Sequence, residues 1–199
     1  TDPNHLHTAE LNYLTSGSLD DPTWQPLIDL SAAYTYFPTY AQILTEYNRA
    51  NHKPVFLVEA NYEFEHLPNT DGGSAQNLRR QEYWTMLSGA TGQLYGSRTW
   101  RFDKGWEADL NTRGLQELGY MKSLLVHRRW YDLVPDQTHT VTTSGYDWRS
   151  EYIAKLTAYL GSYRVFAWVR RQFLAFKTST HFGSISTNIY APTARTADG

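Results

Sequence analysis

Glu59 is the residue of this chain whose position most suggests chemistry. Four apolar residues at 55–58 run directly into it, and Glu63 follows within the next loop. Two carboxyl groups flanking a scissile bond are the usual machinery of glycoside hydrolysis, one as nucleophile or base and the other as acid. A buried carboxylate without such a role needs a partner instead. Candidate partners are Arg79, Arg80 and Tyr62. From the residues alone, Glu59 is a candidate catalytic group or a member of a structural ion pair.

Other polar residues carry weaker signals. Glu63 lies in the loop and is expected to be a supporting hydrogen-bonding group rather than a second catalyst. Glu10 and Asp29 could approach the same cleft or pair with neighbouring charges. His5 and His7 alternate as on one face of a strand, but no third ligand has suitable spacing. We therefore predict no metal site.

Aromatic residues are unusually abundant, with 15 Tyr, 7 Trp and 8 Phe. Their flat apolar faces and polar edges suit sugar rings, although many such residues simply fill a core. Four of them fall at or just beyond expected strand ends: Tyr34, Tyr36, Tyr95 and Trp100. They are candidates for a sugar-binding platform, with core packing as the alternative.

Composition excludes several classes of function. With 199 residues, 41% of them hydrophobic and 19% charged, the chain is expected to fold. A net charge of −2 and the absence of a basic block argue against nucleic-acid binding. No apolar run reaches the roughly 20 residues that a membrane helix needs. No cysteine is present, and no nucleotide or redox cofactor is implied. Because the chain starts at Thr1, we expect a fragment or a processed piece.

The elements that must position these groups alternate between strand and helix. Strands are expected at 5–14, 26–34, 55–59 and 92–97, and helices at about 38–47, 77–87 and 112–126. Four such alternations predict parallel βα units, half of a (β/α)8 barrel. An open α/β sheet is the competing architecture, but no Gly-rich dinucleotide-binding turn follows any strand. In a barrel, Glu59 would lie at the C-terminal end of its strand, where active sites form.

The character of the chain changes near Trp148. Residues 148–176 show dense apolar and aromatic residues at mostly helical spacing, interrupted at Gly161. We predict three segments: the half-barrel at 1–145, a divergent helical segment at 146–179, and a linker or the start of a β-rich module at 180–199.

Several motifs in order resemble the apiosidase-like glycoside hydrolases, a family often joined to a collagen-binding domain of a collagenase. The motifs are "DPNHLHT", "KPVFLVEANYE", "LRRQEYWTMLSGATGQLYG" and "GWEADLNTRGLQELGYMKSLLVHRRWYDLVPDQ". Together they cover about residues 2–145. The resemblance implies a (β/α)8 barrel of which this chain holds about strands five to eight, with "PVFLVE" as strand seven and "GQLYGS" as strand eight.

The same resemblance assigns roles. It implies that Glu59 is the nucleophile of a retaining mechanism and that Trp100 is the aromatic residue after strand eight. Expected supporting or sugar-binding residues are Tyr34, Tyr36, Tyr62, Glu63, Arg80 and Tyr95. The acid/base carboxyl would come from strand four, upstream of Thr1, so the isolated chain is expected to be inactive.

The expected ligand is a carbohydrate of the plant-polysaccharide side-chain type, and the parent protein is expected to be secreted or periplasmic. No cofactor, nucleic acid or membrane is expected as a partner. A half-barrel would self-associate or pair with its missing half. The alternative function is a glycan- or matrix-binding module without hydrolysis.

Overall fold

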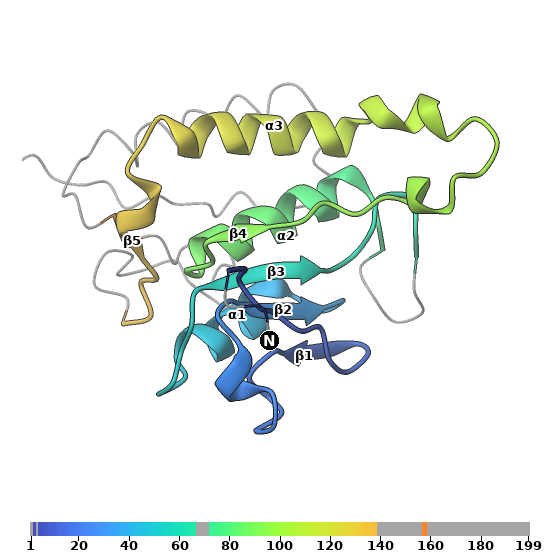
Figure 1. The fold of residues 1–199 in the computed structure, drawn as a ribbon. Coiled ribbons are helices and arrows are strands. Elements are labelled where there is room, and N and C mark those ends of the chain that lie inside the picture. Colours follow the sequence, from blue (N-terminus) through green and yellow to red (C-terminus); the bar gives the residue numbers. More distant parts are fainter. Residues whose placement is uncertain (1, 3, 67–71, 139–156, 159–199) are drawn as a thin grey trace, which may run out of the picture. The chain divides into compact units, whose positions relative to one another are not determined.

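A computed structural model describes residues 2, 4–66, 72–138 and 157–158. Its contacts divide the chain into two compact units, Thr1–Tyr131 and Asp132–Gly199. The described residues of the first unit contain a four-stranded sheet and three α-helices (Figure 1). Every predicted site residue lies in this first unit.

The sheet has strand order β1-β2-β3-β4, formed by β1 (Thr15–Gly17), β2 (Ser31–Thr35), β3 (Val55–Glu59) and β4 (Gly92–Gln93). β2, β3 and β4 are parallel neighbours, and β1 pairs with β2 in the antiparallel sense. A helix follows each parallel strand: α1 (Thr39–Tyr47), α2 (Ala75–Leu87) and α3 (Arg113–Val126). α1 packs on α2 and α2 packs on α3, so the order in space follows the order in the chain. The prediction of parallel βα units is confirmed for β2, β3 and β4.

Each helix begins at a residue suited to that position. The Ser74 hydroxyl accepts a hydrogen bond from the backbone N–H of Asn77, and the Thr112 hydroxyl accepts one from the N–H of Leu115. These N-caps satisfy amide groups that have no partner within the helix. Pro38 precedes α1, where a missing N–H costs nothing. Local sequence therefore sets the starts of all three α-helices.

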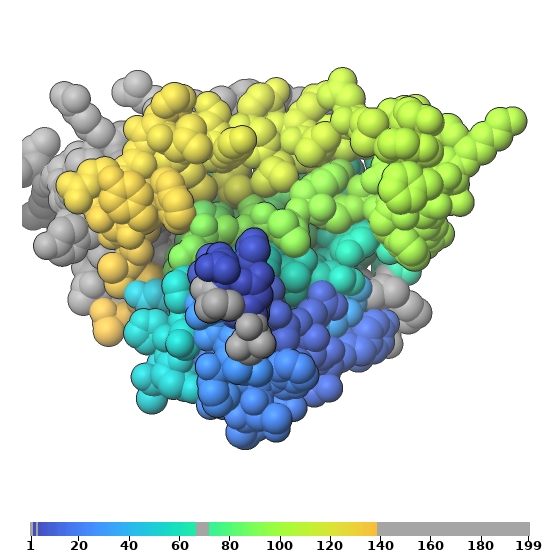
Figure 2. Space-filling model, viewed as in Figure 1, coloured from blue at the N-terminus to red at the C-terminus, as the bar shows by residue number. Residues whose placement is uncertain are grey.

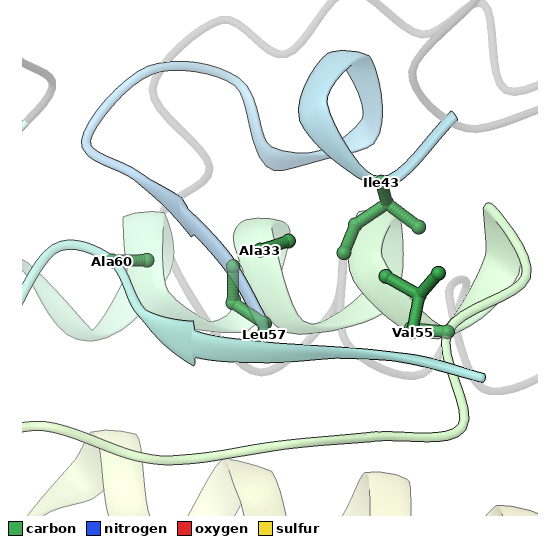
Figure 3. Close-up of a cluster of buried hydrophobic side chains, with 6 residues drawn as sticks. Ala33, Ile43, Val55, Leu57 and Ala60 are labelled. Atoms are coloured by element: carbon green, nitrogen blue, oxygen red, sulfur yellow. The ribbon is translucent and has the colours of Figure 1, made fainter. Parts of the chain in front are cut away.

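The apolar core lies between α1 and the sheet (Figure 3). Ile43 of α1 and Leu57 of β3 are fully buried there. The other members are Ala33, Val55, Ala60 and Ala90. Burying a side chain of the size of Ile43 or Leu57 contributes about 1.5–3 kcal/mol. This core fixes the strand that carries Glu59.

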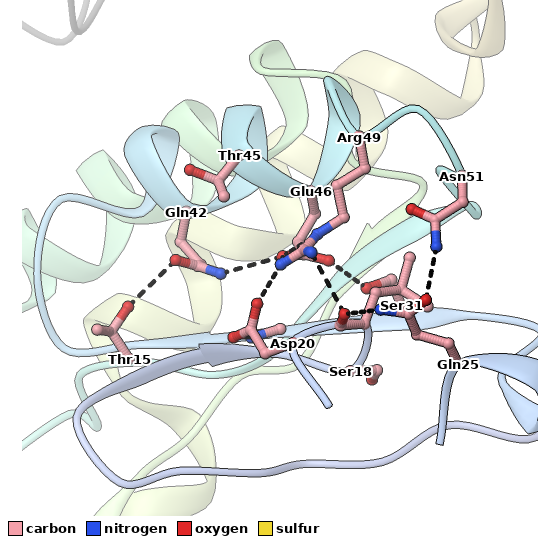
Figure 4. A network of polar contacts seen from close by, with 12 residues as sticks. Thr15, Ser18, Asp20, Gln25, Ser31, Gln42, Thr45, Glu46, Arg49 and Asn51 are labelled. Atoms are coloured by element: carbon pink, nitrogen blue, oxygen red, sulfur yellow. Dashed lines mark hydrogen bonds and ion pairs between the residues drawn. The ribbon is translucent and has the colours of Figure 1, made fainter. Parts of the chain in front are cut away.

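A polar network ties α1 to the N-terminal end of β2 (Figure 4). The fully buried carboxylate of Glu46 accepts a hydrogen bond from the Ser31 hydroxyl at 2.7 Å and pairs with the Arg49 guanidinium at 2.8 Å. Arg49 also pairs with Asp20. A Cβ at Gly17 would lie 2.0 Å from the Glu46 Oε1 atom, so the network requires glycine at that position. It stabilises the end of the sheet opposite Glu59.

An irregularity in the β2–β3 ladder decides which way Glu59 points. Ala33 pairs with Leu57, but the next residue, Tyr34, pairs with Glu59, so Val58 is skipped. Strand side chains alternate between faces, and one extra residue reverses that alternation. Without it, Glu59 would share the helix-facing side of Leu57. With it, Glu59 joins Tyr36 on the opposite face.

Two expected strands differ from the structure. Residues 5–14 are not in a strand, although the backbone carbonyl of His7 accepts hydrogen bonds from the N–H groups of Asp29 and Leu30. The Ser18 side chain binds both the N–H and the carbonyl of Ala9, which replaces a regular ladder there. The strand expected at 26–34 starts only at Ser31, after a 3-10 helix at Gln25–Leu27.

The fourth expected strand is also shorter than predicted. Only Gly92–Gln93 of 92–97 form β4. Beyond it, the chain is held to the end of β3 by an isolated parallel bridge between Glu63 and Ser97. The strand pairing therefore ends just where the candidate site begins.

In the second unit, β5 (Leu133–Val134) pairs with β6 (Thr157–Ala158) in the antiparallel sense. The helix expected over 148–176 is therefore wrong at residues 157–158. The rest of that segment, and all of 180–199, lie outside the described residues, so the predicted boundaries at 145 and 179 stay predictions.

Candidate active site

Glu59 ends β3 and is held by a tyrosine of the neighbouring strand. The Tyr36 hydroxyl donates a hydrogen bond to Oε1 of Glu59. The Tyr34 ring meets the Tyr36 ring edge to face, with centroids 5.3 Å apart, and both residues are buried. Burial raises the pKa of Tyr36, and the hydrogen bond to Glu59 raises it further. Tyr36 is therefore a neutral donor that orients the carboxylate.

Tyr62 approaches Glu59 from the loop after β3. Burial raises the pKa of Tyr62, and the negative charge of Glu59 is the next cause. The position of the ring depends on Gly96, because a Cβ there would lie 2.3 Å from the Cδ1 atom of Tyr62. Glycine at 96 thus allows a second phenol to stand beside the carboxylate.

Glu59 has no cation against it among the described residues. Arg79 pairs instead with Glu117 at 2.7 Å. Arg80 donates to Asn77 on its own helix. The structural ion pair considered as an alternative for Glu59 is thus not formed within the described residues, and the Tyr36 hydroxyl holds the carboxylate instead.

Glu10 is a second carboxyl group close to Glu59. Partial burial raises the pKa of Glu10, and the negative charge of Glu59 adds to the effect. The chain is fixed here because the Ser18 hydroxyl donates to the carbonyl of Ala9 at 2.5 Å. Of the two roles considered for Glu10, proximity to Glu59 is the one that the structure favours.

Glu63 is turned away from this group and is only 2% exposed. Its Oε2 accepts hydrogen bonds from the hydroxyls of Tyr95 and Thr112, and its Oε1 accepts one from the Gly114 N–H at 2.9 Å. Thr112 and Gly114 lie at the start of α3, where the helix dipole favours negative charge, and Tyr95 lies in the segment after β4. Glu63 and Tyr95 thus join the end of β3 to α3, and their predicted contact with a sugar stays untested.

The remaining predicted residues lie around these two clusters. Arg80 stacks its guanidinium on the Trp84 ring at 4.8 Å. Trp100 is 58% exposed, and its indole N–H donates to Oε1 of Glu65 at 2.7 Å. Of the predicted set, the structure gathers Tyr34, Tyr36 and Tyr62 around Glu59 and leaves Arg80 outside that group.

Metal binding finds no support in the described ranges. No group of three His, Asp or Glu side chains there could hold an ion. His7 pairs with Asp29 at 3.0 Å, while His5 pairs with Asp2. Each of the two imidazoles is therefore paired with a different carboxylate. Within the same ranges, no helix has the length and apolarity to cross a membrane.

Three residues important to this geometry were missed from the sequence. Gly96 and Gly114 are placed by close approaches to side chains far along the chain, for which a single sequence gives no signal. Thr112 carried a usable signal, because a threonine directly before a helix is a frequent N-cap.

A family model for "Apiosidase-like, catalytic domain" matches residues 1–132. Among solved structures, one described as "Glycoside hydrolase" is similar at 21% identity with a TM-score of 0.52, covering 62% of this chain and 36% of that one. A glycoside hydrolase family 5 structure from Bacteroides vulgatus ATCC 8482 is similar at 19% identity with a TM-score of 0.52, covering 62% and 35%. None of the curated proteins compared with the chain matches it. The chain thus spans about a third of each structure, and the likeness shows a TIM-barrel-type fold of mixed α/β content.

Proposed function

The chain belongs to the family of apiosidase-like catalytic domains, and from that premise we propose that Glu59 is the nucleophile of a retaining glycoside hydrolase. One observation carries the proposal: Glu59 ends a parallel strand as a carboxylate oriented by Tyr36, and no cation of the described part of the chain pairs with it. A nucleophile needs free lone pairs in a fixed direction, and a phenol hydrogen bond supplies direction without neutralising the charge.

The proposed reaction is a double displacement. A Glu59 carboxylate oxygen attacks the anomeric carbon, and the bond from that carbon to the leaving oxygen breaks. A carboxylic acid elsewhere in the site protonates the leaving oxygen. Water then attacks the anomeric carbon, releases Glu59 and returns a proton to the acid/base. Tyr36 keeps the attacking oxygen in place, and Tyr62 stands close enough to donate to the sugar or to the carboxylate.

We place β2, β3 and β4 at strands six, seven and eight of the barrel, with residues 5–14 in the place of strand five. The acid/base would then come from strand four of a longer protein, to which this chain would contribute the nucleophile side. This assignment agrees with the chain spanning about a third of the related structures. Retaining chemistry needs the two carboxyl groups about 5–5.5 Å apart.

The proposed substrate is a plant-type polysaccharide side chain, with apiose-containing pectic chains as the leading example. This choice rests on the family, as does a secreted or periplasmic location for the parent protein. The open sheet edges at β1 and β4 suggest self-association or pairing with another part of the barrel.

The dependence of the reaction on the leaving group tests whether the chain supplies the nucleophile without the general acid. A site with a nucleophile but no acid should not release a poor leaving group, whereas a dinitrophenolate departs without protonation. We expect the purified chain to leave methyl and phenyl pentosides intact. Glu59→Gln should abolish any reaction with dinitrophenyl pentosides, and Glu107→Gln is the matched control at an exposed glutamate outside the group around Glu59. Turnover of methyl pentosides by the chain alone would contradict the proposal.

A glycan-binding module without hydrolysis is the second candidate, favoured by exposed aromatic side chains such as Trp100. For such a module, glycan affinity should fall with Trp100→Ala and should not change with Glu59→Gln, and no dinitrophenyl glycoside should react. An enzyme should instead lose its reaction with Glu59→Gln.

A further inference from the structure

Four aromatic residues gather on two loops of the first unit, beyond the residues placed around Glu59. Phe64 follows β3, and Trp100, Phe102 and Trp106 lie in the segment of residues 98–106 that follows β4. We call these four residues the aromatic shelf. Phe64, Trp100 and Phe102 are 47%, 58% and 69% exposed. Exposed aromatic residues in one place mark an interaction surface more often than isolated ones do.

Two of these four residues have a strained, left-handed backbone conformation. Phe64 and Phe102 have φ values of 67° and 52°, in the left-handed region. That region costs a side-chain-bearing residue roughly 1–2 kcal/mol relative to the right-handed one and is rare for bulky residues. Both positions would favour glycine on backbone grounds alone. Strain of this kind persists at functional sites, where the contribution of the side chain to function offsets the energetic cost of the strained backbone.

Polar contacts fix the shelf on its loops. The Trp100 indole N–H and the Arg101 guanidinium both donate to Oε1 of Glu65. The Arg98 guanidinium covers the Phe64 ring at 4.6 Å and pairs with Asp109 at 2.8 Å. The polar edge of Trp100 is thus occupied within the protein. The Arg101 guanidinium also lies over the Trp100 ring at 5.5 Å, so the exposed parts of Phe64 and Trp100 are those that their arginines leave uncovered.

The outer pair of rings is fixed in a different way. The Phe102 ring meets the Trp106 ring edge to face at 5.1 Å. Phe102 stays 69% exposed despite this contact, so Trp106 braces the ring without covering it. An aromatic face with an immobilised edge binds at a low cost in side-chain entropy.

The shelf adjoins the end of the sheet that carries Glu59. The Glu63 N–H donates to the Gly96 carbonyl, and the Arg98 N–H donates to the Glu63 carbonyl, so the two loops are joined by backbone hydrogen bonds. In Figure 1 the arrowheads of β2 and β3 point toward the yellow-green segment that carries Trp100 and Phe102. The space-filling view shows that segment projecting from the edge of the unit (Figure 2).

We propose that the aromatic shelf binds further sugar units of a neutral glycan whose reacting unit lies at Glu59. Arg98 and Arg101 are each paired with a carboxylate, and the one further cation of this loop, Lys104, is outnumbered by Asp103 and Glu107. The loop therefore carries no excess of positive charge that would select an acidic sugar, whereas stacked rings suit the C–H faces of neutral ones. The proposal deepens the proposed function and rests on it for the position of the reacting sugar.

Phe64→Gly, Phe102→Gly and the double variant test this inference, with cellohexaose, xylohexaose and hexagalacturonate as probes in calorimetric titrations. Each single change should weaken binding of a neutral hexasaccharide about 2- to 10-fold. Relief of the left-handed strain should at the same time raise the Tm by about 2–8 °C. Leu14→Gly is the matched control, since Leu14 also has a left-handed φ of 76° and lies outside the shelf. It should raise the Tm by a similar amount.

Saturation transfer from aromatic protons to sugar protons in the unaltered chain covers the case in which a variant fails to fold, and it should be observed for a neutral hexasaccharide. Unchanged affinity in the double variant, tighter binding of hexagalacturonate, or no binding of any hexasaccharide would overturn the shelf. If the aromatic shelf binds sugars but Glu59 does not react, only the assignment of Glu59 as the nucleophile is refuted. If Glu59 reacts but the aromatic shelf binds no sugar, only the proposal for the shelf is refuted.

Discussion

Glu82 of α2 offers a test of how the helices behind the candidate site are packed. It is 2% exposed, and neither carboxyl oxygen has a hydrogen-bond partner among the described residues. Burial raises the pKa of Glu82 well above its ordinary value, and the negative charges of Glu117 and Glu63 raise it further, while Arg79 opposes them. The neutral form of Glu82 is therefore favoured to a higher pH than that of an exposed glutamate.

The replacement Glu82→Gln keeps the size of the side chain and removes its titration. In the parent chain, the unfolded state loses the Glu82 proton near pH 4.5 while the folded state keeps it. The stability that this proton contributes is complete below the unfolded pKa and is lost as the pH rises toward the folded pKa. Within that window, the parent chain should lose about 1.4 kcal/mol per pH unit relative to Glu82→Gln.

Urea unfolding followed by tryptophan fluorescence at pH 5, 6 and 7 measures this difference directly. Glu82→Met serves as a second variant, because it removes the unsatisfied carboxyl group altogether. It should raise the free energy of unfolding at pH 7 by about 1–3 kcal/mol. Equal pH slopes for the parent chain and Glu82→Gln, or a destabilised Glu82→Met, would refute the reasoning.

Two further predictions concern glycines that face carboxylates. Gly17→Ala should force the buried Glu46 carboxylate away from Arg49 and lower the free energy of unfolding by about 3 kcal/mol, measured by urea unfolding; a change below about 1 kcal/mol would show that the network can relax. Gly114→Ala places a Cβ 2.7 Å from the Glu63 carboxylate, so it should loosen the start of α3 and speed amide hydrogen exchange there, while Gly119→Ala, whose Cβ meets nothing within 4 Å, should not.

Local sequence features predicted the elements that carry the site. The apolar run at 55–58 marked β3, helical spacing marked α1 and α3, and Pro38 marked the start of α1. The position of Glu59 at a strand end followed directly. These features work because periodicity and capping act within a few residues.

The details that decide the chemistry depend on contacts between distant segments. The ladder irregularity at Ala33 and Tyr34 turns Glu59 toward Tyr36, and its cause lies in pairing between strands rather than in either strand. The Glu63 carboxylate accepts hydrogen bonds from Thr112 and Gly114, which lie about 50 residues further along the chain. Periodicity could not anticipate either contact.

The buried face of α2 was hard to predict from the sequence for a related reason. That face includes Arg79, Gln81 and Glu82, so the hydrophobic spacing is weak. Leu78 and Met86 are buried, whereas Tyr83 and Leu87, which share the apolar pattern, are only half-buried. Between them, Arg79 is also buried and forms an ion pair with Glu117 of α3. A helix that packs through polar groups gives little periodic signal.

The most direct test of the account is covalent labelling of Glu59. The purified chain would be incubated with dinitrophenyl 2-deoxy-2-fluoro pentosides and hexosides and then examined by intact mass measurement and peptide mapping. Because dinitrophenolate needs no proton to leave, labelling requires the nucleophile and not the acid/base. We predict one added glycosyl group, located on Glu59 and absent in Glu59→Gln. A label on another residue, or the same label in Glu59→Gln, would contradict the assignment of Glu59 as the nucleophile.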